Sequence, residues 1–135
     1  MPAAYPPLLE HTARVPSMFD QDGADSRTAV GRVRRPGSIN SVEYIPNWAR
    51  TGANTNYRTL NLYNRGQAGA GTTLVATLAL TSGVDLTASA AKTITITAAN
   101  AAVVVGDVLE WVSSATGAGA PETGGLVIVQ QNAGS

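Results

Sequence analysis

Apolar and polar residues alternate in short runs through most of the chain, and glycine or proline separates many of these runs. The clearest are 57–64 (YRTLNLYN) and 92–97 (KTITIT), where leucine or isoleucine recurs at every second central position. A period of two places apolar side chains on one face of a strand. The other runs that we interpret as strands span 28–35, 38–45, 73–81, 101–105, 108–114 and 126–131.

The number and spacing of these runs predict the fold class. Seven or eight short strands with turn signals between them are typical of antiparallel all-β domains. We therefore expect a single all-β domain over residues 26–135, either a β-sandwich or a jelly roll. The alternation also predicts which side chains share a face in each strand, and the clearest sets are Leu60 with Leu62, Leu74 with Ala76, Leu78 and Leu80, Ile94 with Ile96, and Leu109 with Trp111.

Residues 98–105 allow two interpretations. Their alanine content favours a short helix, because alanine has the highest helix propensity. The β-branched run 103–105, which ends at Gly106, favours a loop followed by a strand instead. We expect the loop and the strand.

Residues 1–25 lack a regular period and contain four prolines, which disfavour both a helix and a central strand. We therefore expect an extended N-terminal arm over this range. One possibility is a flexible terminus. The other is a segment that becomes ordered along a neighbouring subunit, because the range holds many large apolar side chains for a solvated tail. Its candidate contact residues are Tyr5, Leu8, Leu9, Val15, Met18 and Phe19.

The formal net charge of zero conceals an uneven distribution. Residues 26–65 hold seven arginines and one glutamate, whereas acidic residues outnumber basic ones on either side. Three of these arginines, Arg32, Arg34 and Arg35, precede the turn pair Pro36-Gly37. They could form a solvated strand edge, where charge discourages unwanted pairing, or a docking patch for carboxylates. Nucleic acid is the least favoured partner, because the patch is small and the chain is neutral.

The chain offers few groups for catalysis or metal binding. It contains no cysteine and one histidine, His11, so neither a thiolate metal site nor a Ser-His-Asp arrangement is expected. The acidic run 20–25 (DQDGAD) lacks the glutamate that closes a calcium loop. Glu43 and Glu110 lie in the middle of expected strands, and their separation cannot be derived from the sequence. We therefore expect no enzyme activity, no cofactor and no metal.

Two aromatic residues close together in the sequence have different expected roles. Tyr44 lies within an alternating run and is expected to fill the core. Trp48 lies in a polar loop, where it is either tucked under the loop or exposed for contact. An exposed aromatic ring is suitable both for stacking on a sugar and for anchoring a protein interface.

Two stretches of the second half carry a family resemblance: GTTLVATLALTSGVDLTASAAKTITIT, followed by VVVGDVLEWVSSATGAGAPETGGLVIVQQ. Their order of a hydroxyl-rich strand, a Gly-Asp-Val-Leu turn, a Gly-rich loop and a final Val/Ile strand resembles virion β-sandwich proteins of tailed bacteriophages. Capsid decoration (cement) proteins of this kind commonly add an extended N-terminal arm. The resemblance covers about 60 residues and rests on the pattern of strands and loops.

This resemblance implies a structural virion protein that binds across subunits of the major capsid protein on the capsid exterior. We expect a homo-oligomer, with a trimer favoured. Assembly in the host cytoplasm is expected, because residues 1–25 lack the apolar run of a signal peptide and no stretch resembles a membrane helix. The alternatives are a carbohydrate-binding or adhesive β-domain with a surface glycan as its partner, and a tail or head-fibre component of the virion.

Overall fold

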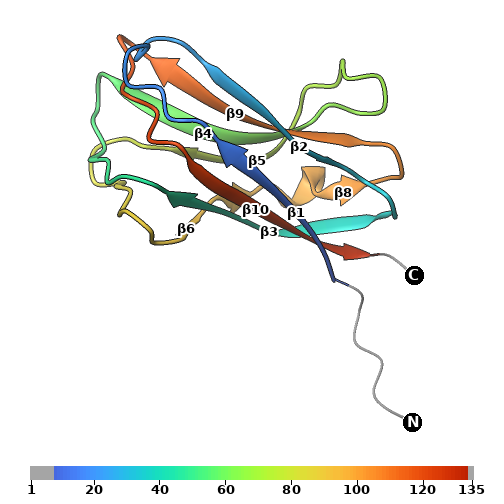
Figure 1. Ribbon diagram of the computed structural model, residues 1–135. Coiled ribbons are helices and arrows are strands. Elements are labelled where there is room, and N and C mark those ends of the chain that lie inside the picture. Colours follow the sequence, from blue (N-terminus) through green and yellow to red (C-terminus); the bar gives the residue numbers. More distant parts are fainter. Residues whose placement is uncertain (1–7, 134–135) are drawn as a thin grey trace.

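The computed structural model of the protein describes residues 8–133, which form two antiparallel sheets packed face to face (Figure 1). This arrangement confirms the expected all-β sandwich. The first sheet has the order β1 (Leu8–Val15), β10 (Gly125–Ala133), β3 (Gly37–Pro46) and β6 (Lys92–Thr93), and β8 (Ala102–Val103) also pairs with β3. The second sheet has the order β2 (Ser26–Arg32), β9 (Val108–Thr116), β4 (Tyr57–Asn64), β5 (Thr73–Ala79) and β7 (Thr95–Ile96).

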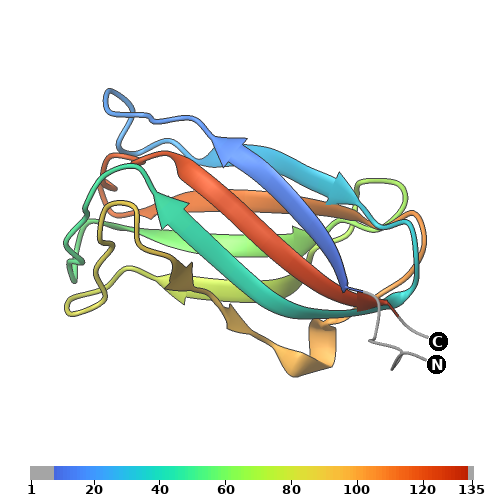
Figure 2. The ribbon, with the colours of Figure 1, turned by 60° about the horizontal axis from the view of Figure 1, so that its bottom comes forward.

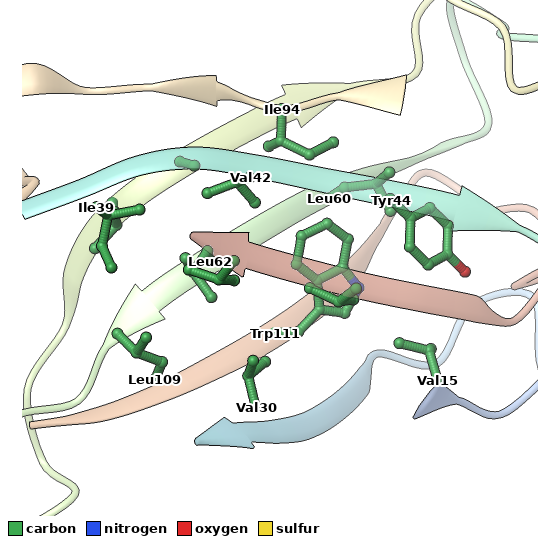
Figure 3. Close-up of a cluster of buried hydrophobic side chains, with 14 of the residues drawn as sticks. Val15, Val30, Ile39, Val42, Tyr44, Leu60, Leu62, Ile94, Leu109 and Trp111 are labelled. Atoms are coloured by element: carbon green, nitrogen blue, oxygen red, sulfur yellow. The ribbon is translucent and has the colours of Figure 1, made fainter. Parts of the chain in front are cut away.

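The core lies between the sheets and is centred on two aromatic rings. Tyr44 of β3 and Trp111 of β9 stack with ring centroids 5.3 Å apart and an interplanar angle of 28°. Both side chains are fully buried, and Figure 3 shows them among aliphatic side chains of both sheets. The expected inward positions of Leu60, Leu62 and Leu109 are confirmed, because each is almost completely buried. Burial of these large apolar groups supplies the main favourable term for folding.

The run 92–97, expected as one strand, is divided between the two sheets. β6 pairs with β3 in the first sheet, and β7 pairs with β5 in the second. Ile94 lies between β6 and β7, where its N–H donates to the Val42 carbonyl at 2.9 Å and its side chain is buried. The chain thus crosses from one sheet to the other at Ile94. Ile96 is partly buried and packs against the same core.

Two further segments differ in detail from the expected strands. The β4–β5 pairing shifts register at Leu62/Tyr63, so that Val75 is an extra residue in β5. As a result the consecutive residues Val75 and Ala76 are both buried, and the expected alternation through β5 is broken.

Residues 98–100 form one 3₁₀ turn (η1, Ala98–Asn100) ahead of the two-residue strand β8. The loop-then-strand interpretation therefore describes 98–105 better than a helix.

The described sandwich already includes residues 8–15, whereas the sequence analysis expected it to start at residue 26. β1 pairs with β10 along its whole length. Its odd-numbered side chains from Leu9 to Val15 face the interior, where Val15 is buried in the core. In Figure 2 the first sheet is in front, and β1, in dark blue, lies beside β10, in red. Only residues before Leu8 remain for an arm, and they lie outside the described part of the chain.

Candidate functional site

Three exposed arginines lie at one end of the sandwich, which we call the basic end: Arg32, Arg34 and Arg35. Val33, between them, is fully buried. Its N–H donates to the Asp107 carbonyl and its carbonyl accepts from Gly106, both at 2.8 Å. These backbone bonds and the buried valine hold the segment in place. The arginine side chains beside Val33 are therefore exposed on a fixed backbone.

Two exposed valines lie in the turn that bonds to this arginine segment. Val104 and Val105 are adjacent in the chain and are 53% and 54% exposed. The Asp107 carboxylate fixes the turn, because it accepts hydrogen bonds from the Val104 N–H at 3.0 Å and the Asn64 amide at 2.9 Å. The basic end thus combines cationic groups with an apolar contact.

The first described residue also lies at the basic end. Leu8 is opposite Asn132 in the β1–β10 pairing, and Gly37, just after the arginines, is opposite Ala133 in the β10–β3 pairing. Buried Gln131 joins these strands to the arginine segment, because its amide donates to the Arg35 carbonyl at 2.6 Å. The described part of the chain therefore begins beside the arginine segment.

The expected arm residues do not form one exposed segment. Tyr5 and the side chain of Leu8 lie outside the described part of the structure. Leu9 faces inward and is partly buried, and Val15 belongs to the core, so neither is free to anchor an arm. Met18 and Phe19 lie in the β1–β2 loop, at the other end of β1. Met18 is half-buried, whereas Phe19 is 53% exposed.

We call the opposite end of the sandwich the aromatic end, after Phe19 and Trp48. Trp48 is 59% exposed in the β3–β4 loop, which resolves the two interpretations of this residue in favour of exposure. The β1–β2 and β3–β4 loops both form backbone hydrogen bonds with the segment just before β10. Met18 pairs with Glu122, and the Asn47 N–H donates to the Gly124 carbonyl at 2.9 Å. The two exposed rings are therefore presented from neighbouring loops.

A buried arginine, Arg58, holds the loops of the aromatic end together, and the sequence analysis did not identify it. It is 3% exposed. Its guanidinium donates to the Ala120 carbonyl at 2.6 Å, to the Ser113 carbonyl at 3.1 Å, and to carbonyls of the β1–β2 loop. In β4, Arg58 shares its face with Leu60 and Leu62. That inward position of a charged residue was a detectable signal in the sequence.

A buried carboxylate, Glu122, completes the polar interior of the aromatic end. It is 2% exposed, and it accepts hydrogen bonds from the Tyr44 hydroxyl and the Gly124 N–H, both at 3.0 Å. Burial and the neighbouring Glu122 charge raise the pKa of Tyr44. Tyr44 therefore remains a neutral donor to this carboxylate.

The other carboxylates noted in the sequence do not converge. Glu43 lies in the first sheet and Glu110 in the second. Glu110 forms ion pairs of 2.9 Å with Arg27 and with Arg65. Burial acts to raise the pKa of Glu110, but hydrogen bonds and charge from the two arginines outweigh it and lower the pKa below its ordinary value. Asp25 accepts a hydrogen bond from the Ala115 N–H at 3.0 Å.

Residues 8–133 contain no group of three metal-binding side chains, no pocket, and no helix long and apolar enough to span a membrane. No protein-family model, curated protein or solved structure matches the chain. The candidate functional surfaces are therefore defined by geometry alone: the basic end and the aromatic end.

Proposed function

We propose that this protein is a structural virion protein that decorates and cements the capsid of a tailed bacteriophage, with its basic end against the major capsid protein. One observation carries the proposal. The exposed arginines, the exposed valines of the adjacent turn, and the start of β1 all lie at the same end of the sandwich. A small domain can bind a larger surface through one end that combines charge with an apolar contact.

The chemistry of the basic end favours a protein surface with exposed carboxylates. Each guanidinium can grip a carboxylate through two parallel hydrogen bonds. Val104 and Val105 would be removed from water on docking, and apolar burial contributes roughly 25 cal/mol per Å². Exposed acidic side chains such as Asp20 and Asp85 lie in loops at the other end of the strands. This separation of charge would orient the domain on an acidic partner.

Sedimentation of the protein with capsids that lack it tests the proposal. The full chain is expected to co-sediment at a saturable ratio and to protect the particles against heat. Arg34→Glu combined with Arg35→Glu should weaken this binding by at least tenfold, because two attractive contacts become repulsive. Trp48→Ala, at the other end, is the matched control and should bind normally. Failure of the wild-type chain to co-sediment would refute the capsid role.

The same assay tests the N-terminal segment. Deletion of residues 1–7 should leave the sandwich folded, because it keeps the whole described pairing of β1 with β10, and should weaken capsid binding if these residues reach a neighbouring subunit. Deletion of residues 1–25 is not a suitable test, since it removes β1 and the buried Val15. Unchanged binding after deletion of residues 1–7 would remove the arm from the proposal and leave the arginines.

The second candidate function, glycan binding by an adhesive domain or fibre component, is favoured by the aromatic end. Trp48 and Phe19 are both more than half exposed on neighbouring loops. Aromatic faces of this kind stack on sugar rings. Binding of the isolated protein to host-cell polysaccharide that is lost in Trp48→Ala and kept in Arg34→Glu/Arg35→Glu would support this function over cementing.

A further inference from the structure

β1 is the longest regular free edge in the described part of the sandwich. It is an eight-residue edge strand, paired with β10 alone, with continuous register and no internal proline. The corresponding edge of the second sheet, β2, is interrupted by an irregularity between Ala29 and Gly31. On the other side of the sandwich, β6, β7 and β8 are two residues long. A long regular edge is a template for pairing with another strand.

The hydrogen bonds of the first sheet fix which backbone groups point at this free edge. The Val42 carbonyl accepts from the Ile94 N–H, so the even-numbered residues of β3 near Val42 point away from β10. The odd-numbered ones, such as Glu43, therefore bond to β10, at even-numbered partners such as Ile128. The direction of bonding alternates from residue to residue along an antiparallel strand. The odd-numbered residues of β10 thus bond to β1.

In the β1–β10 register, odd-numbered residues face odd-numbered residues, as Val127 faces Ala13. The odd-numbered residues of β1 are consequently bonded to β10. Its even-numbered residues, Glu10, Thr12 and Arg14, direct their N–H and C=O groups to the free edge. Their side chains are exposed on the outer face of the first sheet.

This edge is complementary to a second copy of itself. If two β1 strands pair antiparallel about a two-fold axis at Thr12, the N–H and C=O groups at the free edge of one copy lie opposite those of the other copy. The same register places Glu10 directly opposite Arg14 of the other copy, twice. Directly opposite side chains on one face are about 5 Å apart, and opposite charges there are stabilising. Within residues 8–133, Arg14 makes no side-chain hydrogen bond or ion pair, and Glu10 accepts one long hydrogen bond of 3.4 Å from the Gln130 amide.

We propose that β1 is a homodimer interface, in which two copies pair edge to edge about Thr12 with reciprocal Glu10–Arg14 ion pairs and join their first sheets into one continuous sheet. The proposal does not depend on capsid binding. A two-fold contact of this kind is isologous, so it closes after two copies, and antiparallel pairing places their basic ends at opposite ends of the dimer. It predicts a dimer where the sequence analysis favoured a trimer.

A charge swap tests the pairing. Sedimentation of the full chain over a range of concentrations should show a monomer–dimer equilibrium. Arg14→Glu alone and Glu10→Arg alone should each raise the dimer Kd by roughly tenfold or more, because each places two like-charge pairs across the axis. The double variant Glu10→Arg/Arg14→Glu restores both pairs and should return the Kd to near the wild-type value. Lys92→Glu, on the opposite edge of the same sheet, is the matched control.

A single cysteine tests the register, since the chain has no cysteine of its own. Position 12 lies on the proposed axis, so oxidation of the Thr12→Cys variant should form a disulfide between the two copies of the dimer. Glu43→Cys, in the same row of the sheet but two strands away, should not cross-link. The proposal would be overturned if the wild-type chain stayed monomeric at all concentrations or formed a trimer. It would also be overturned if the Arg14→Glu variant dimerised with the same Kd as the wild type. Capsid binding by such a chain would still leave the cement role standing.

Discussion

Arginine has different roles at the two ends of the sandwich. At the aromatic end, Arg58 is buried and its guanidinium bonds to carbonyls of β9 and of two loops. At the basic end, Arg34 and Arg35 are exposed, and the part of the chain that holds them in place is Val33 and the backbone around it. The comparison teaches that a charged side chain shapes the fold at one end and remains available for a partner at the other.

The largest expected effect comes from removing the buried arginine. Arg58→Ala leaves several carbonyls without a donor and opens a cavity, so the free energy of unfolding should fall by about 3–5 kcal/mol. Urea unfolding followed by tryptophan fluorescence measures this loss, because unfolding exposes the buried Trp111 to water. A loss below about 1 kcal/mol would mean that the loops of the aromatic end are held by other contacts.

A smaller effect is expected from the Tyr44 hydroxyl. Tyr44→Phe removes the donor to buried Glu122 and should lower the free energy of unfolding by about 1–2 kcal/mol while the stacked ring is kept. Urea unfolding at pH 7 measures this loss. A loss no larger than that of an exposed substitution would show that Glu122 is satisfied by its other partners.

The same residue should give the wild-type protein a dependence on alkaline pH. Because burial raises the pKa of Tyr44, the folded state retains a proton that the unfolded state loses above its ordinary pKa of about 10. The free energy of unfolding should therefore fall as the pH rises past this value. Tyr44→Phe should show a weaker fall, which unfolding curves at pH 9 and pH 11 can measure.

A further expected effect concerns the ion pairs of Glu110 on the second sheet. Glu110→Gln removes the charge that pairs with Arg27 and Arg65, so it should lower the free energy of unfolding at pH 7. The loss should be only roughly 1 kcal/mol, because Arg27 is largely exposed and its ion pair is screened by water. The lowered pKa of Glu110 means that this contribution is present above its ordinary pKa and is lost as the pH falls through the folded-state value. The variant and the wild type should therefore converge in stability at acidic pH, as urea unfolding can show.

The smallest effect on stability is expected at the basic end. Arg34→Ala and Arg35→Ala should change the free energy of unfolding by less than about 0.5 kcal/mol, as is usual for exposed side chains. Their effect should appear instead in the affinity for capsids. A loss of stability comparable to that of Arg58→Ala would break the contrast between the two ends.

β1 is a strand that the sequence analysis did not predict, because it expected an extended arm over residues 1–25. Its inward side chains Leu9, His11, Ala13 and Val15 alternate with exposed polar ones, so the signal of a strand was present. Pro7 and Pro16 lie just outside the strand, so the range 1–25 taken as a whole lacks a regular period although residues 8–15 alternate. A position-by-position test of residues 8–15 would have found the strand, as it would have found inward-facing Arg58 on β4.

The sequence by itself determined the all-β class, the positions of most strands and the inward faces of β4 and β9, because alternation is a local property of an extended chain. The tertiary structure decided which strands share a sheet, where β5 gains its extra residue, and that Ile94 marks a crossing between sheets. It also decided that Trp48 is exposed and that the arginine segment lies beside Leu8. These features depend on pairing between segments far apart in the chain, such as β1 with β10, and no local pattern specifies such a partner.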